Sequence, residues 1–67
     1  MENEMTRSEE AIWKYLVEHK RPVMAGTLAK RFILSQSHVT SVLKKLVEQG
    51  IADRTRVGKH YFYRIKN

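Results

Sequence analysis

The sequence contains no cysteine, a single proline, and no apolar run that approaches the length of a membrane span. Without cysteine, neither disulfides nor thiolate metal sites can hold the fold together, so its stability must come from apolar packing, as is usual in a reducing compartment. A membrane span needs about 18 apolar residues, and the acidic N-terminus lacks the basic-then-apolar order of a signal peptide. We therefore expect a soluble, cytoplasmic protein with no membrane partner.

Recognisable catalytic and metal-binding patterns are also absent from the sequence. It has no glycine-rich phosphate loop, and Ser37 and His38 are adjacent, so their side chains would diverge on a helix. The other histidines, His19 and His60, are far apart in the sequence, and a tetrahedral zinc ion would need further ligands. We expect no enzyme activity, no bound metal and no cofactor.

The length and the charge limit the function further. A chain of 67 residues forms one domain at most, which we expect to span 1–67 and to be ordered over about 6–66. Residues 1–20 carry three Lys or Arg against five Glu, a net charge of −2, whereas 21–50 and 51–67 each carry five against one, +4 apiece, for a total of +6. This uneven distribution of charge indicates a polyanionic partner. Surface charge that only keeps the protein soluble would give a similar net charge.

The first predicted helix is marked at both ends. Thr6 followed by Glu9 is the T-x-x-E pattern of a capping box, so we expect a helix that begins near Arg7. Its apolar pattern continues to about His19 and stops before Pro22, because proline disfavours a helical residue in front of it. Residues 22–24 then form a short extended segment.

Two further helices follow. Residues 25–32 form a compact amphipathic helix without a capping side chain at Met24. A longer helix, at about 36–49, begins after Ser35, a good N-cap, and ends before Gly50, where a left-handed C-terminal cap is expected. The side of this helix that needs a core carries Val39, Val42, Leu43, Leu46 and Val47.

After the third helix the pattern becomes alternating. Residues 51–56 and 60–65, joined through 57–59, predict a β-hairpin. Tyr61, Tyr63 and Ile65 share one face of its second strand, and Phe62 and Arg64 share the other. The sequence leaves open which face packs inward, although Ile65 favours the first.

The order of these elements and three stretches of sequence resemble a winged helix-turn-helix domain of small bacterial transcription regulators, broadly MarR-like or ArsR-like. The resemblance covers about residues 7–66. The matching stretches are LAKRF (28–32) for the second helix, LSQSHVTSVLKKLVEQGI (34–51) for the turn and third helix, and RTRVGKHYFYRI (54–65) for the wing. The fold class that this implies is α+β, with three helices, a short strand between the first two, and a C-terminal β-hairpin wing.

The sequence departs from this family at two positions. Family members often have a small capping residue where Met24 stands and glycine where Ile33 stands. A β-branched residue fits positive φ poorly, so the turn at Ile33 must either use another backbone conformation or carry strain.

The fold implies a sequence-specific protein that binds double-stranded DNA and regulates transcription. The recognition helix at about 36–49 would enter the major groove, and the wing at 54–64 would lie on the backbone or in the minor groove. Each of these features also has a simpler interpretation. The polar face of the third helix could be an ordinary solvated surface rich in Ser and Thr. The charges of the wing could only protect an exposed strand edge from pairing with another chain. The candidate DNA-contacting residues are Gln36, Ser37, Thr40, Ser41, Lys44, Lys30, Arg31, Arg54, Arg56, Lys59 and Arg64.

Other partners remain open at this point. The same fold can serve as a protein-protein interaction module, and the positive charge also allows RNA binding. The aromatic residues of the first helix and the wing could stack on bases, but they are more simply explained as core. Because one domain of this size contacts few base pairs, we expect a weak homodimer through the first helix, around Trp13 and Val17, or pairing on DNA.

Overall fold

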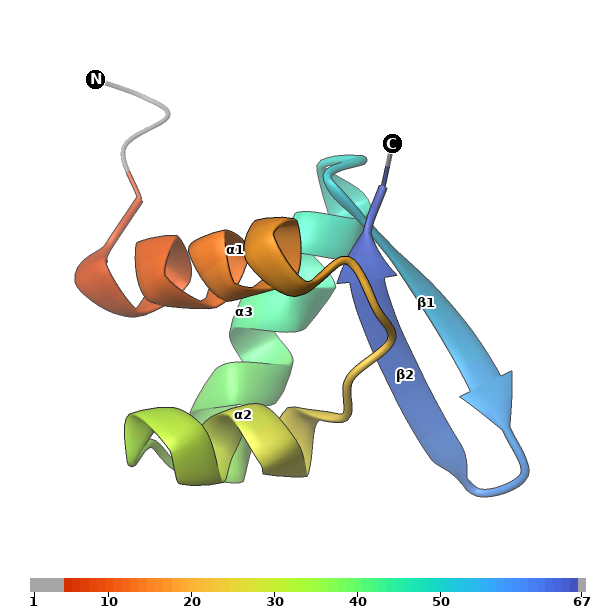
Figure 1. Ribbon diagram of the computed structural model, residues 1–67. Coiled ribbons are helices and arrows are strands. Elements are labelled where there is room, and N and C mark those ends of the chain that lie inside the picture. Colours follow the sequence, from red (N-terminus) through yellow and green to blue (C-terminus); the bar gives the residue numbers. More distant parts are fainter. Residues whose placement is uncertain (1–4, 67) are drawn as a thin grey trace.

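The computed structural model describes residues 5–66, which form three helices followed by a two-stranded antiparallel sheet. The helix α3 packs against α1, α2 and β1, and the hairpin runs along one side of the helices (Figure 1). This is the winged helix-turn-helix architecture that the sequence predicted. Residues 1–4 and 67, which were expected to fall outside the ordered part, lie outside the described residues. The elements are α1 (Arg7–His19), α2 (Ala25–Phe32), α3 (Gln36–Glu48), β1 (Ala52–Val57) and β2 (His60–Ile65).

The start of α1 is a complete capping box. The backbone N–H of Glu9 donates to Thr6 Oγ1 at 3.2 Å, and the backbone N–H of Thr6 donates to Glu9 Oε1 at 3.0 Å. Two N–H groups that a helix start leaves without partners are thereby satisfied. The helix ends at His19. Its C-cap, Lys20, has a left-handed backbone with φ of 50°, and the chain then extends through Pro22.

The turn between α2 and α3 has the strained backbone, one of the two outcomes that the sequence left open at Ile33. Ile33 adopts φ of 55° and ψ of 53°, and its N–H donates to the Ala29 carbonyl as a left-handed C-terminal cap of α2. Its side chain is 91% exposed, so packing does not compensate for the strain. The following helix is capped as expected, because Ser35 Oγ accepts a hydrogen bond from the N–H of His38 at 3.2 Å.

The wing differs from the prediction in its turn. Val57 was expected in the connection, but it belongs to β1 and pairs with His60, which leaves a loop of Gly58 and Lys59. Gly58 has φ of 63°, a conformation that suits the tight two-residue turns of hairpins.

A third segment joins the base of the wing. The N–H of Val23 donates to the Tyr63 carbonyl, and the N–H of Tyr63 donates to the Val23 carbonyl, both at 2.8 Å. The predicted extended segment before α2 is therefore an edge partner of β2.

The core lies between the three helices and the inner face of the wing, the side that carries Ala52, Arg54, Arg56, Tyr61, Tyr63 and Ile65. Ile65 and Tyr63 are buried there, so the face that Ile65 favoured is the one that packs inward. Tyr61, farther toward the turn on the same face, is 42% exposed. The largest fully buried side chains are Ile12, Leu16, Leu28, Val39, Leu43 and Leu46.

The helices that the structure describes are too short and too polar to cross a bilayer.

Candidate nucleic-acid interface

The exposed face of α3 carries the polar residues that the sequence singled out. Val39, Val42, Leu43 and Leu46 anchor the helix in the core, which turns the opposite face outward. On that face Gln36, Ser37, Ser41 and Lys44 are exposed and Thr40 is half-buried.

A shallow depression of about 370 Å³ lies between this helix, the start of α2 and the turn of the wing. Gln36 and Thr40 contribute from α3, and Lys59 and Tyr61 contribute from the wing. The first turns of α3 and the tip of the hairpin therefore border one concave surface. The remaining lining residues are Met24, Ala25, Gly26, His60 and Tyr63.

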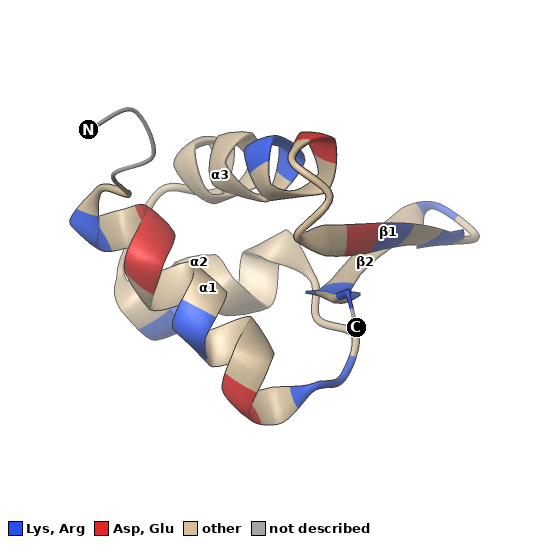
Figure 2. Cartoon of the chain, turned by 90° about the horizontal axis from the view of Figure 1, so that it is seen from above, with Lys and Arg blue, Asp and Glu red and all other residues tan. Residues whose placement is uncertain are grey.

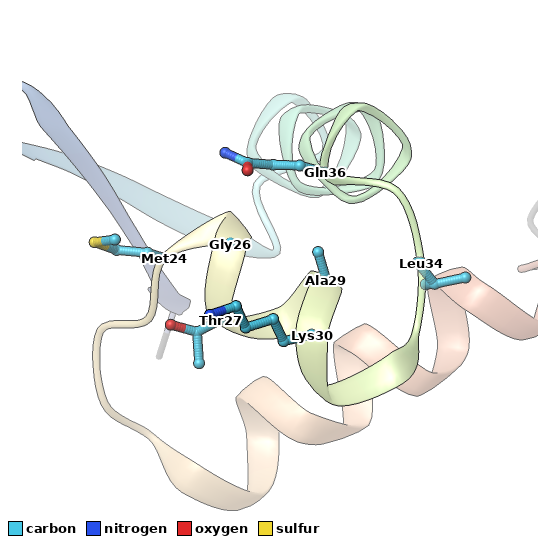
Figure 3. Close-up of a pocket in the computed structure, with 7 residues that line it drawn as sticks. All are labelled: Met24, Gly26, Thr27, Ala29, Lys30, Leu34 and Gln36. Carbon is cyan, nitrogen blue, oxygen red and sulfur yellow. The ribbon is translucent and has the colours of Figure 1, made fainter.

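A second depression, of about 360 Å³, adjoins the first along α2 (Figure 3). Gln36 borders both, and a Cβ built on Gly26 would lie 3.8 Å from Gln36 Oε1, so the Gln36 amide lies over the first turn of α2. Thr27 and Lys30 line the α2 side. The structure thus brings Lys30 to the same surface as the polar face of α3.

Arg31, the neighbour of Lys30, lies elsewhere. Its guanidinium is over the Tyr15 ring, with Cζ 5.5 Å from the ring centroid, in a groove between α1 and α2 that Lys14 and Glu18 also line. The structure does not bring Arg31 together with the candidate residues of α3.

The cations of the wing divide between its two faces. Arg54 and Arg56 lie on the inner face, Lys59 lies at the turn, and Arg64 lies on the outer face opposite Asp53. Arg54 also borders a small depression with Lys44. The inner face and the turn therefore join the surface of α3, and Arg64 does not.

The charges are distributed in keeping with this surface. Basic residues predominate along the hairpin, whereas α1 carries both acidic and basic ones (Figure 2). Within residues 5–66, ion pairs join Lys14 to Glu10 and Lys45 to Glu9, and neither reaches the wing. The hydrogen bond from Lys45 Nζ, at 2.9 Å, and the backbone hydrogen bond from Thr6 hold the pKa of Glu9 below its ordinary value. Within residues 5–66, no ion pair joins the arginines of the inner face to an acidic side chain, although Glu48 lines the depression that Arg54 borders.

Sequence reasoning missed the role of Tyr61 in this surface. It grouped Tyr61 with the core aromatics, but the side chain borders the depression beside α3. Strand alternation already placed Tyr61 on the face of Tyr63 and Ile65. The pairing register of the two strands, which sets Arg56 opposite Tyr61, could not be predicted from the sequence. Among the described residues, no three His, Asp or Glu side chains gather in a way that could hold a metal ion.

A scan of the sequence against protein-family models and a search of curated proteins found no match. Solved structures do match. The ST1889 protein from the archaeon Sulfolobus tokodaii is 35% identical, with a TM-score of 0.87 over 94% of this chain and 63% of its own. A possible transcriptional regulator from Methanosarcina mazei Go1 is 25% identical, with a TM-score of 0.88 over 94% of this chain and 57% of its own.

The transcriptional regulator BldR from Sulfolobus solfataricus is 26% identical, with a TM-score of 0.78 over 92% of this chain and 45% of its own. The chain therefore spans less than two thirds of each of these proteins. The fold is the same throughout the region that they share with it.

Proposed function

Because the chain is a winged helix-turn-helix domain of the kind found in transcriptional regulators, we propose that it binds double-stranded DNA sequence-specifically and regulates transcription. The observation that carries this proposal is the concave surface on which the polar face of α3 meets the turn and the inner face of the wing. Two of the structurally similar proteins are named as regulators, which supports the same reading.

The shape of this surface suits a DNA duplex. The major groove of B-DNA is about 12 Å wide and admits an α-helix, whose first turns meet the base edges. The first turn of α3 is exposed and capped by Ser35. With α3 in the major groove, the wing reaches the adjacent backbone or minor groove.

The candidate residues then have distinct roles. Gln36 can donate to and accept from adenine, and the hydroxyls of Ser37, Thr40 and Ser41 can bond to base edges or phosphates. The flanking cations, which neutralise phosphate, are Lys30, Lys44, Arg54, Arg56 and Lys59. Arg31 and Arg64 lie away from this surface and are not assigned to it.

The experiment measures binding to mixed genomic duplex DNA across a salt series. The wing variant Arg54→Ala/Arg56→Ala loses two phosphate contacts, so its log–log salt slope should be flatter than that of the wild type by about 1.8. The control Arg31→Ala/Arg64→Ala removes the same charge from outside the surface and should change the slope much less.

The helix variant Ser37→Ala/Thr40→Ala tests base reading. It should erode the preference among sequences in a selection from random duplexes and leave the salt slope nearly unchanged, because no charge is removed. A structured RNA competitor in the same assay distinguishes duplex DNA from RNA. If the wild type binds no DNA at low salt, the proposal is wrong. If the two charge variants weaken binding equally, the assignment of Arg54 and Arg56 rather than Arg31 and Arg64 to the interface is wrong.

We further propose that two copies pair weakly through the outer side of α1, or only on DNA. Trp13 and Val17 are half-buried, so each leaves part of an apolar side chain outside the core. Paired half-sites supply the specificity that a single recognition helix lacks. Analytical ultracentrifugation of the free and DNA-bound protein tests this, and a strict monomer in both states contradicts it.

The proposed activity is binding rather than catalysis, in keeping with similar proteins that are named as regulators. The proposed place of action is the cytoplasm, in keeping with a DNA partner and a sequence without cysteine. Fractionation of cells that express the tagged chain tests its location.

A further inference from the structure

The Tyr61 ring lies close to both arginines of the inner face. The Arg54 Cζ lies 4.9 Å and the Arg56 Cζ lies 5.9 Å from the centroid of the Tyr61 ring. Arg56 is directly across the sheet from Tyr61, and Arg54 is one pair farther along, diagonal to it. Both distances lie within the range over which the face of an aromatic ring attracts a guanidinium.

This arrangement offsets a repulsion that the wing would otherwise carry. Arg54, Arg56 and Lys59 lie within one short hairpin, and none of them is ion-paired within residues 5–66. Within residues 5–66, the one side-chain hydrogen bond of these arginines runs from Arg56 Nε to the Gly58 carbonyl and is 2.9 Å long. Neither contact occupies the terminal guanidinium nitrogens, which are the donors that grip a phosphate.

We propose that Tyr61 is a positioning residue that holds the guanidiniums of Arg54 and Arg56 ready for the phosphates of a nucleic acid. This inference rests on the proposed function. The ring fixes the two side chains before binding, so that less of their rotamer freedom is lost when the complex forms. Tyr61 itself borders the depression beside α3, so the two arginines that contact its ring lie next to the surface proposed to receive DNA.

The neighbours of Tyr61 in the strand cannot take this role. Tyr63 is 4% exposed and belongs to the core, and Phe62 lies on the outer face opposite Thr55. Phe62 therefore provides a matched control, an aromatic residue one position away that faces neither arginine.

The first test uses the free wild-type protein and needs no DNA. In NMR spectra, ring currents should shift the δ-proton resonances of Arg54 and Arg56 upfield of those of Arg64, which has no ring contact in the structure. Tyr61→Leu should remove these shifts, and Phe62→Leu should preserve them. If Arg54 and Arg56 resonate with Arg64 in the wild type, the positioning role is refuted.

The second test is DNA binding at fixed salt. Tyr61→Leu should bind roughly 5- to 150-fold more weakly than the wild type, the loss expected when two arginine side chains must give up their rotamer freedom on binding. Tyr61→Phe keeps the ring and should restore most of the affinity. If Tyr61→Phe is as weak as Tyr61→Leu, the hydroxyl rather than the ring is responsible, and the proposal fails.

A double-mutant cycle then separates a role through the arginines from a direct contact with DNA. In the Arg54→Ala/Arg56→Ala background, Tyr61→Leu should have almost no further effect. An equal loss in both backgrounds would overturn the positioning role while leaving DNA binding intact. Failure of the wild type to bind DNA would instead count against the proposed function, with the NMR test still deciding the arrangement of the ring and the arginines.

Discussion

Ile33 is an unusual residue to find between two helices. Its backbone is left-handed, which costs an L-residue roughly 1–2 kcal/mol, and its β-branched side chain is 91% exposed. Burial of the side chain therefore does not offset the free-energy cost of this backbone conformation. The neighbouring residues impose it instead, because the N–H of Leu34 donates to the Ala29 carbonyl at 2.9 Å and Ser35 must cap the next helix.

We expect Ile33→Gly to stabilise the protein. Glycine adopts positive φ freely, so the variant should raise the free energy of unfolding by about 0.5–1 kcal/mol after its greater entropy in the unfolded chain is deducted. Urea unfolding followed by circular dichroism measures the change. Ile33→Ala removes the same exposed apolar side chain but keeps a Cβ, so it should gain much less, and equal stability of the two variants would argue against strain at this position.

Substitutions at two adjacent residues of α3 should have separate effects, one on protein stability and the other on DNA binding. Leu43 is fully buried, and Leu43→Ala should lower the free energy of unfolding by about 2–5 kcal/mol. A domain of this size has only about 3–10 kcal/mol in total, so this variant is close to unfolding. Lys44→Ala, next to it on the exposed face, should change thermal stability little while weakening DNA binding. Loss of binding in Leu43→Ala at a temperature where it remains folded would contradict this division.

A salt bridge joins the start of α1 to α3. Lys45 is 54% exposed, so water screens this pair and its contribution stays below about 1 kcal/mol. The pKa of Glu9 is lowered chiefly by the hydrogen bond from Lys45. A carboxyl group with a lowered folded-state pKa stabilises the fold fully above its ordinary value of 4.5, and this contribution is lost as the pH falls through the folded-state value.

Glu9→Gln should reveal this dependence, because glutamine can keep the capping box but carries no charge. We expect the variant to be less stable than the wild type at pH 7 and the difference to shrink as the pH falls below about 4. Urea unfolding at both pH values measures it. In a Lys45→Met background the difference should depend less on pH, and an unchanged dependence would show that Lys45 is not its cause.

At the scale of the whole molecule, positive charge borders the concave surface. Five cations lie on or beside the concave surface, namely Lys30, Lys44, Arg54, Arg56 and Lys59. If each neutralises one phosphate, the log–log salt slope should reach about −4.5 for each bound chain. A slope near −6.3 per chain would mean that Arg31 and Arg64 also contact DNA, contrary to their placement. Titration from low to moderate salt, with stoichiometry from ultracentrifugation, measures the slope.

Much of this architecture could be predicted because local signals specify it. The capping box at Thr6, the N-cap Ser35 and the stop at Gly50 locate two helices to within a residue. The arrangement of the wing could not be predicted in the same way. Strand alternation places Arg54 and Arg56 on the same face of β1. Only packing against the helices decides that this face, and not the face of Arg64, turns inward.

The pair of hydrogen bonds between Val23 and Tyr63 gives the wing a fixed pivot. Tyr63 is held by β1 on one side and by the segment before α2 on the other, and its ring is buried, so the strand cannot swing there. Beyond it, toward Gly58, the backbone hydrogen bonds given for the described residues join the hairpin only to itself. We therefore expect any bending of the wing to concentrate beyond Tyr63. The cations near the turn could then adjust to a bound backbone while the base of the wing keeps its place beside α3.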